Sequence, residues 1–302
     1  MSLLVAGTIP VGVGETICGP VGRDASGRLT VAGDPLPVCQ GSSAMLSAAL
    51  AVTRYLGVEP PVALLGGDVG RGEGTRAVYA QLRREVESRE PAVLAFHYVQ
   101  PIMALMREAV EWLGPMAADG GIRLVADAGG MYAAKAAGLA PHFDLMTPDV
   151  GEVGFLADEC ATHPAYVSHY LFGASSFDPV EFARLSHENG GSARVLLIKG
   201  STDRIAEGGV VRETIAEPCV PELEAIGGTG DTVTGLASAF MAAGFPTLDA
   251  AVCAARANRH AGLSMGARPD HRAEDLVAAL PGVFAEHLCE WAGVCPAPAD
   301  PA

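Results

Sequence analysis

Short apolar runs alternate along the chain with segments of helical periodicity. The apolar runs predict buried strands at residues 3–9, 61–67, 92–98, 122–127, 143–147 and 194–199. Hydrophobic positions spaced three and four apart predict helices at 42–57, with a serine cap, at 101–113 and at 178–190. This alternation is typical of βαβ units, so we expect a mostly parallel sheet with helices on both faces.

The pattern changes after residue 200. Residues 201–215 predict a β-hairpin, and three helices are expected at about 231–243, 247–265 and 273–291, the last interrupted at Pro281. We therefore expect an α/β fold. It comprises a single domain over residues 1–293, a three-layer sandwich around a central mostly parallel sheet, and a flexible tail at 294–302.

Charge and hydrophobicity exclude several classes of partner. The 302 residues include 20 Lys and Arg against 35 Asp and Glu, a net charge of −15, so no nucleic-acid partner is expected. No apolar run approaches the roughly 18 residues of a membrane span, and no membrane association is expected. The first positive charge is Arg23, which argues against a secretory signal and favours a cytoplasmic protein. Seven cysteines without a C-x-x-C pair give little support to a zinc site or a disulfide framework.

Lysine is rare in this chain. Of the 20 basic residues, 18 are arginine, and the two lysines are Lys135 and Lys199. Lys199 ends a predicted apolar strand, where ligands of parallel sheets bind, so it is a candidate for a specific task. The alternative is a strand-end lysine that packs its stem along the sheet and keeps its ammonium in water.

A glycine cluster at 227–235, GGTGDTVTG, gives the strongest chemical signal. Glycines let backbone N–H groups turn toward one point, and the following helix adds its positive end, so the segment predicts an anion site. Asp231 falls in the first turn of that helix. It is either a helix cap or a base facing the anion, and a base beside phosphate indicates phosphoryl chemistry. No P-loop motif is present.

Three segments in this order, TPDVGE (147–152), VLLIKG (195–200) and GGTGDTVTG (227–235), resemble the ribokinase-like superfamily, and within it the nucleotide-dependent NAD(P)H-hydrate dehydratases. The resemblance implies a ribokinase-like sandwich in which Asp231 is the catalytic base. It also implies the phosphate-binding groups, which are the backbone amides of Gly228, Thr229 and Gly230 and the side chain of Lys199.

The same resemblance implies the cofactors. Asp149 and Glu152 stand where the superfamily holds Mg²⁺, and Asn258 and His260 where its kinases line the adenine pocket, although an ordinary helix face is the alternative for that pair. We therefore expect ADP or ATP with Mg²⁺ as cofactors. The expected partner is a small-molecule substrate, possibly hydrated NADH or NADPH, and the chain is expected to form a homo-oligomer.

Departures from the dehydratase pattern leave the reaction open. Asp149-Val150 replaces the His-Pro of T-P-H-P-G-E, and only Ala126-Asp127-Ala128 remains of an Asp-Ala-Asp-Ala segment. The first 120 residues match neither the dehydratase nor the sugar-kinase pattern well. Three functions therefore stand: a hydrate dehydratase, a small-molecule kinase acting on a sugar or pyrimidine, and a non-catalytic nucleotide-binding relative.

Overall fold

The central sheet of the computed structural model is mostly parallel. The structure describes residues 2–11, 16–36, 40–162, 178–293 and 295. Within them the strand order is β11-β10-β9-β8-β7-β6-β1-β5-β2-β3-β4. The parallel strands are β1 (Leu3–Ile9), β5 (Val62–Gly67), β6 (Val93–His97), β7 (Arg123–Ala126), β8 (Leu145–Met146) and β9 (Val195–Ile198). Each overlaps a predicted strand, which confirms the parallel sheet.

Antiparallel strands extend the sheet at both edges. The predicted hairpin forms β10 (Asp203–Glu207) and β11 (Val210–Ile215) beside β9. The opposite edge carries β2 (Ile17–Arg23), β3 (Leu29–Val31) and β4 (Asp34–Pro35), which the sequence pattern did not predict. Gly19, Pro20 and Gly22 interrupt the alternation in β2, so its strand signal is weak.

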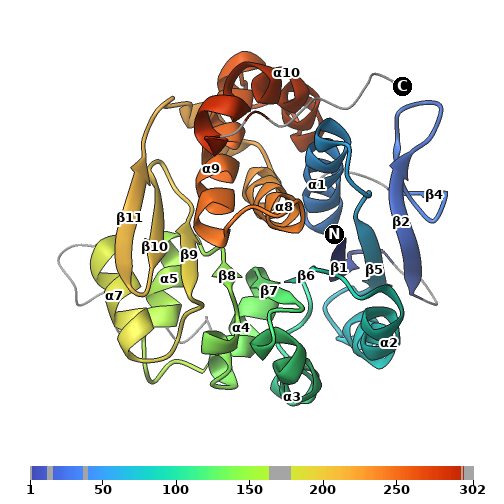
Figure 1. Ribbon diagram of the computed structural model, residues 1–302, viewed down its shortest axis with the longest axis vertical. Coiled ribbons are helices and arrows are strands. Elements are labelled where there is room, and N and C mark those ends of the chain that lie inside the picture. The colour runs from blue at the N-terminus through green and yellow to red at the C-terminus, as the bar shows by residue number, and fades with distance from the viewer. Residues whose placement is uncertain (1, 12–15, 37–39, 163–177, 294, 296–302) are drawn as a thin grey trace.

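Helices cover both faces of the sheet, as Figure 1 shows. One layer holds α1 (Ser42–Leu56), α8 (Thr229–Ala242), α9 (Thr247–Ser264) and α10 (Ala273–Ala292). The other holds α2 (Glu73–Arg89), α3 (Met103–Ala118), α4 (Ala128–Ala136), α5 (Val150–Ala157) and α7 (Pro179–Glu188). Alternate side chains of β1 pack into two separate hydrophobic cores. Leu3 and Val5 lie in the core on one face of the sheet, and Leu4 and Ala6 lie in the core on the other. The three-layer sandwich is therefore confirmed.

Helix α8 lies at the centre of its layer. Every residue from Asp231 to Ala242 is buried, and Gly235 lets the helix approach α1 so closely that a Cβ there would lie 2.1 Å from the Met45 carbonyl oxygen. Close packing fixes the axis of α8. Its N-terminus consequently points at the carboxyl ends of the parallel strands.

Two local predictions are wrong. Helix α10 runs through Pro281 without interruption, because the proline is exposed while the neighbouring Leu280 and Phe284 keep the helix packed against the core. The cap of α1 is Gly41, and the buried hydroxyl of Ser42 donates instead to the Thr8 carbonyl. The predicted tail lies, apart from Cys295, outside the described residues. None of the described helices has the length and apolar character needed to cross a bilayer.

Candidate active site

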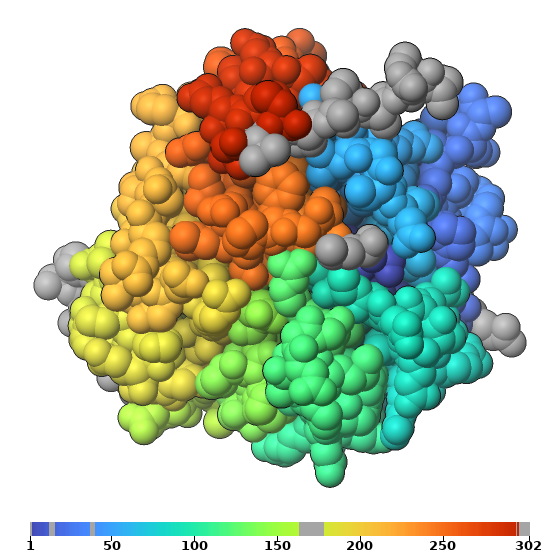
Figure 2. Space-filling model, viewed as in Figure 1, coloured from blue at the N-terminus to red at the C-terminus, as the bar shows by residue number. Residues whose placement is uncertain are grey.

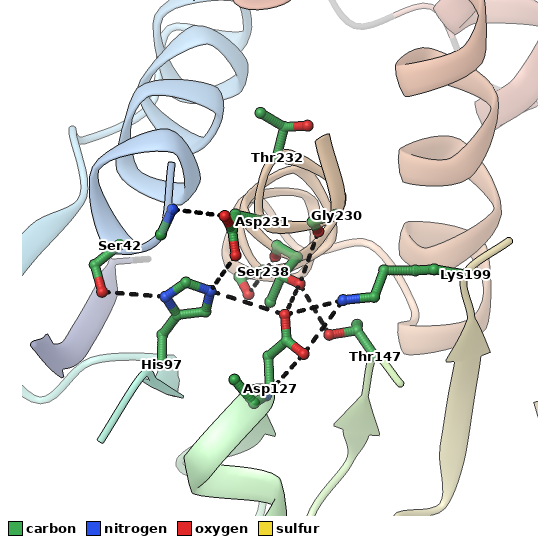
Figure 3. Close-up of polar contacts among 12 residues, drawn as sticks. Ser42, His97, Asp127, Thr147, Lys199, Gly230, Asp231, Thr232 and Ser238 are labelled. Atoms are coloured by element: carbon green, nitrogen blue, oxygen red, sulfur yellow. Dashed lines mark hydrogen bonds and ion pairs between the residues drawn. The ribbon is translucent and has the colours of Figure 1, made fainter. Parts of the chain in front are cut away.

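Polar side chains converge where the parallel strands end. His97 ends β6, Asp127 follows β7, Thr147 follows β8 and Lys199 follows β9. Figure 3 shows them gathered below the start of α8, which contributes Asp231. Parallel sheets bind ligands at this edge, so the cluster is the candidate active site.

Asp231 is held by contacts outside its own helix. Gly228 is the N-cap, and no side chain caps α8. The Asp231 carboxylate instead accepts the backbone N–H of Gly41 at 2.6 Å through Oδ2, and Oδ1 lies 3.2 Å from Nε2 of His97. The helix-cap alternative for Asp231 is therefore wrong.

The backbone amides that open α8 face the pocket. Within the described residues, the N–H groups of Gly228, Thr229 and Gly230 donate to no acceptor, as expected for the first positions of a helix. Gly228 has φ 94°, and a Cβ there would lie 3.1 Å from the Cα of Gln40. Glycine therefore leaves three amides open at a positive helix end, which is the geometry of an anion site.

Lys199 is buried rather than extended into water. Its side chain is 15% exposed, and Nζ donates to the Asp127 oxygens at 3.1 and 3.3 Å. Burial alone lowers the pKa of Lys199, but the carboxylates of Asp127, Glu152 and Asp231 outweigh burial and raise it. Lys199 therefore stays charged at the pocket, and the alternative of an ammonium in water is wrong.

Asp127 is a central residue of the site that the motif analysis did not assign. Thr234 of α8 donates to Oδ2 at 2.6 Å, and the backbone N–H of Ala128 donates to Oδ1 at 2.8 Å. Burial raises the pKa of Asp127, yet Lys199 and His97 outweigh burial and lower it. The carboxylate thus links β7, β9 and α8. Its place at the end of a predicted strand was the signal that could have found it.

His97 is fully buried and was also missed. Its Nδ1 lies 3.1 Å from the Ser42 hydroxyl, which donates its only proton to the Thr8 carbonyl, so Nδ1 must carry the hydrogen. Nε2 has no hydrogen-bond partner among the described residues and faces the carboxylates of Asp231 and Asp127, the latter at 3.8 Å. The histidine therefore packs directly against the candidate base.

The three groups His97, Asp127 and Asp231 could hold a metal ion by distance alone. One donor atom from each lies within 4.8 Å of the others. The ammonium of Lys199, however, already pairs with the same Asp127 oxygen that faces His97. A second cation there would meet that positive charge, so we assign no metal to this cluster.

Asp149 and Glu152, the predicted Mg²⁺ residues, form a capping box at the start of α5. The backbone N–H of each donates to the other's carboxylate, at 2.7 and 2.8 Å, and the Tyr132 hydroxyl donates to Oε1 of Glu152. Burial, followed by the charges of Asp127 and Asp149, raises the pKa of Glu152. Both side chains line the pocket, and Oδ2 of Asp149 accepts no described hydrogen bond. The excess negative charge and the free Oδ2 of Asp149 fit Mg²⁺, which prefers carboxylate oxygens as ligands.

The two residues predicted for adenine binding separate. Asn258 lines the pocket and accepts the Thr232 hydroxyl at 2.7 Å. His260 packs against His287 and Trp291 of α10, with ring centroids 4.4 and 5.1 Å away, and does not line the pocket. Two helical positions turn a side chain by about 200°, so neighbours of this spacing face opposite sides. The structure therefore contradicts the expectation for His260.

Arg259, between them, braces the loops of this wall. It pairs with Asp203 at 2.7 Å and donates to the carbonyl oxygens of Gly200 and Ser201, both at 2.9 Å. Both charged side chains are less than 10% exposed. The buried arginine therefore fixes the loop that follows Lys199.

Most of the residues described above, but not His97, Thr147 or His260, line a pocket of about 870 Å³. Lys199, the start of α8 and residues 258–259 of α9 form one side of the pocket. Tyr98, Asp127 and Ala128, at the ends of β6 and β7, form the other. In Figure 2 the orange surface of α8 and α9 lies against the green and yellow surface of the layer below. The pocket is large enough for a drug-sized ligand, which typically occupies roughly 300–1,000 Å³.

Comparison with known proteins identifies the family. A family model described as NAD(P)H-hydrate dehydratase, Carb_kinase, matches residues 107–281. The chain belongs to this family. An uncharacterized protein of Methanocaldococcus jannaschii is 32% identical over 239 residues, which are 78% of this chain and 96% of that protein. The family match, over residues 107–281, spans all three motifs that carried the resemblance.

Solved structures show the same fold in distant relatives. Pyridoxal kinase from Lactobacillus plantarum is 15% identical with a TM-score of 0.55, over 95% of this chain and 98% of that one. The Bacillus subtilis protein YxkO, a putative kinase, is 17% identical with a TM-score of 0.54, over 94% and 91%. The ADP complex of Bacillus subtilis pyridoxal kinase is 16% identical with a TM-score of 0.53, over 84% and 88%. The ribokinase-like fold is confirmed.

Proposed function

We propose that the protein transfers a nucleotide phosphoryl group to the hydroxyl of a small molecule, as an NAD(P)H-hydrate dehydratase. The observation that carries the proposal is the position of Asp231, a buried carboxylate beside three open amides and the Lys199 ammonium. An anion site next to a carboxylate that can accept a proton is what in-line phosphoryl transfer requires.

In this proposal each group has one task. Asp231 accepts the proton of the substrate hydroxyl, while the backbone N–H of Gly41 holds its carboxylate in place and the His97 ring packs against it. The hydroxyl oxygen then bonds to the terminal phosphorus, and the bond from phosphorus to the nucleotide's bridging oxygen breaks. The amides of 228–230 and Lys199 stabilise the charge on the phosphoryl oxygens. In a dehydratase the C–O bond breaks next and phosphate leaves with its electron pair. The neighbouring ring carbon then loses a proton, and the electrons of that C–H bond restore the C=C bond of the reduced nicotinamide ring.

The nucleotide and the metal have assigned places in the proposal. Asn258 lies near the apolar side chains of Val220, Leu223 and Val233 in the pocket wall, which suits a nucleoside. The ADP complex of the Bacillus subtilis pyridoxal kinase supports a nucleotide in this fold. Asp149 and Glu152 would hold Mg²⁺, which supplies positive charge against the phosphates when bound.

A second candidate is a small-molecule kinase. It is favoured by Asp149-x-x-Glu152, in which Asp149-Val150 replaces the His-Pro of the dehydratase T-P-H-P-G-E and which forms the capping box at the pocket. The same residues would act, and the phosphorylated product would be released without loss of phosphate.

The deciding experiment supplies Mg²⁺ with ADP or ATP and compares acceptors. Hydrated NADH should recover the absorbance of NADH if the protein is a dehydratase, whereas a panel of sugars, pyridines and pyrimidines should yield a phosphorylated product if it is a kinase. Absence of both reactions in a protein that binds ADP would favour the non-catalytic relative.

Asp231→Asn should lower turnover by about 10²–10⁴-fold, because general-base catalysis has that magnitude. The matched control is Asp249→Asn, which changes the third residue of α9, the position that Asp231 occupies in α8. The control should retain normal turnover. Activity that survives Asp231→Asn would contradict the assignment of the base.

A further inference from the structure

A second cavity lies away from the candidate active site, where α1 and α10 meet the hairpin of β2 and β3 (Figure 1). Its volume is about 540 Å³, within the range of roughly 300–1,000 Å³ that small-molecule ligands occupy. The small residues Gly27, Ala51 and Ala278 are part of its lining and leave this space between the three elements. It shares no lining residue with the active-site pocket, so it is a separate candidate site.

The walls of this cavity are mainly apolar. Leu50 of α1 and Val277 of α10, which are 2% and 3% exposed, line it from opposite helices. The Tyr55 ring also lines it and packs against Phe284, with ring centroids 5.3 Å apart. A ligand that enters the cavity therefore moves its own surface out of water and against hydrocarbon, which favours an apolar body.

One arginine is fixed beside these apolar walls. Nη1 of Arg23 donates to the Gly27 carbonyl and Nη2 to the Ser47 hydroxyl, both at 2.7 Å. The Glu274 carboxylate lies 3.9 Å from Nη1, too far for a hydrogen bond. The buried Ser47 hydroxyl donates to no described residue. The remaining guanidinium N–H groups and the Ser47 proton are therefore available to an anion.

The cavity carries more positive than negative charge. Arg54, in the last turn of α1, also lines it and forms no ion pair with a described residue. Glu274 is the one carboxylate among the lining residues, so the guanidinium groups of Arg23 and Arg54 face a single negative charge. This local excess is opposite in sign to the net charge of −15 of the whole chain. A ligand with one negative charge balances it.

We propose that this cavity is a binding site for a small amphiphilic anion, an apolar chain or ring that carries one carboxylate. The carboxylate lies between Arg23, Ser47 and Arg54, where it accepts charged hydrogen bonds. The apolar body packs against Leu50 and Val277. A cationic amphiphile would meet two like charges instead, and a sugar would lose hydrogen bonds to water at the apolar walls. The site does not depend on the reaction proposed for the active-site pocket.

Calorimetry at pH 7.5 with hexanoate, octanoate and octylammonium tests the ligand class. Wild type should bind octanoate more tightly than octylammonium, because the two chains differ only in the sign of the charged group. The two additional CH₂ groups of octanoate should make it bind about four- to fifteenfold more tightly than hexanoate. Saturation with ADP should leave the octanoate affinity unchanged, since the two pockets share no lining residue.

Two pairs of variants test the location. Ala278→Trp puts a large ring at an exposed lining position of α10 and should abolish octanoate binding. Its control is Ala285→Trp, at an exposed position of the same helix outside the cavity, which should bind like wild type. Arg54→Gln should weaken octanoate binding by about two- to fivefold, the range for an exposed ion pair. Arg28→Gln, in the turn before β3 and outside the cavity, should not.

Results of two kinds would overturn the proposal. The ligand class is wrong if wild type fails to bind octanoate at millimolar concentration, binds octylammonium as tightly, or binds hexanoate as tightly as octanoate. The location is wrong if Ala278→Trp binds octanoate like wild type, or if ADP displaces octanoate.

Discussion

The two walls of the pocket are built on different principles. The wall formed by Lys199, the start of α8 and Arg259 uses left-handed backbone only at a glycine, Gly228, and its charges are paired with carboxylates or carbonyl oxygens. The opposite wall, at Tyr98 and Ala128, has left-handed backbone at two neighbouring strand ends. The first wall is held by charge and the second by close packing of the loop after β6 on α4. Two of the family's motifs, VLLIKG and GGTGDTVTG, lie on the first wall, whereas the second retains only Ala126-Asp127-Ala128 of the Asp-Ala-Asp-Ala segment.

The difference teaches where specificity can vary. Phosphate is the same in every nucleotide, so a wall that binds it needs fixed amides and charges. An acceptor differs between enzymes of one fold, and a loop held by packing can present another side chain without changing the phosphate site.

The largest effect is expected at Arg259. Arg259→Met leaves the Asp203 carboxylate buried without its partner and frees the carbonyl oxygens of Gly200 and Ser201. The free energy of unfolding should fall by about 3–5 kcal/mol in urea titrations, the range for breaking a buried pair. Arg256→Met is the control, because Arg256 lies one turn earlier in α9 and forms no ion pair among the described residues. If Arg259→Met and Arg256→Met lost equal free energies of unfolding, Arg259 would not brace the loop after Lys199.

Lys199→Met should have two effects. Nucleotide affinity should fall by about 1.5–3 kcal/mol, the scale of hydrogen bonds to charged groups, and unfolding free energy by about 2 kcal/mol, because Asp127 loses its partner. A strand-end lysine with its ammonium in water, the alternative that the sequence left open, would leave the stability almost unchanged on this substitution. Calorimetry with ADP and urea titration measure the two quantities. Lys135→Met, which changes a lysine bound to the Asp158 and Ala161 carbonyls, should leave ADP affinity unchanged.

Acid should reduce the difference in unfolding free energy between wild type and Lys199→Met. In wild type, Lys199 and His97 hold the pKa of Asp127 below its ordinary 3.8, so this carboxylate stabilises the fold above about pH 4 and loses that contribution as pH falls further. Without Lys199, burial favours the protonated carboxyl. The gap between wild type and Lys199→Met should therefore narrow between pH 7 and pH 3, and a constant gap would contradict the pairing.

At the wall with left-handed backbone we expect a smaller effect, in which glycine is more stabilising than alanine. Residue 98 has φ 56°, a conformation that glycine adopts without steric penalty and alanine does not. The free energy of unfolding of Tyr98→Gly should therefore exceed that of Tyr98→Ala by about 1 kcal/mol. At Tyr132, inside α4, the order should reverse by a similar amount, since glycine weakens a helix. Alanine that equals or exceeds glycine at position 98 would show that the backbone is not strained.

Glu152→Gln should give the smallest effect. Burial raises the pKa of Glu152 in the folded protein above its ordinary 4.5. As pH rises through the raised pKa, the buried carboxyl becomes charged and the folded state loses stability. Below pH 4.5 the carboxyl is neutral in both the folded and the unfolded state, so it has no such effect. The variant, which can still accept the Asp149 N–H, should be more stable by under about 1 kcal/mol at pH 7.5 and equal to wild type at pH 4. Thermal melts at both pH values provide the measurement, and a variant that is less stable at pH 7.5 would contradict it.

Local patterns were enough to predict most of the sheet and half of the site. The parallel strands are short apolar runs, and Asp231 and Lys199 lie in motifs. Helix α2 was not predicted, because its charged surface leaves only a narrow apolar stripe at Val78, Leu82 and Val86. His97 and Gly41 could not be found in the same way, since their role depends on packing against a helix that is remote in the chain.

The hydrogen bond from Gly41 to Asp231 joins residues 190 positions apart. A gene fragment for residues 107–281 would encode every residue of the family match and would lack Gly41, Ser42 and His97. Its Asp231 would lack the amide that binds its carboxylate and the ring that packs against it. The part of the chain that matches the family model is therefore too short to form a complete active site. Recombination within this gene preserves the site only if the codons for Gly41 and Asp231 are inherited together.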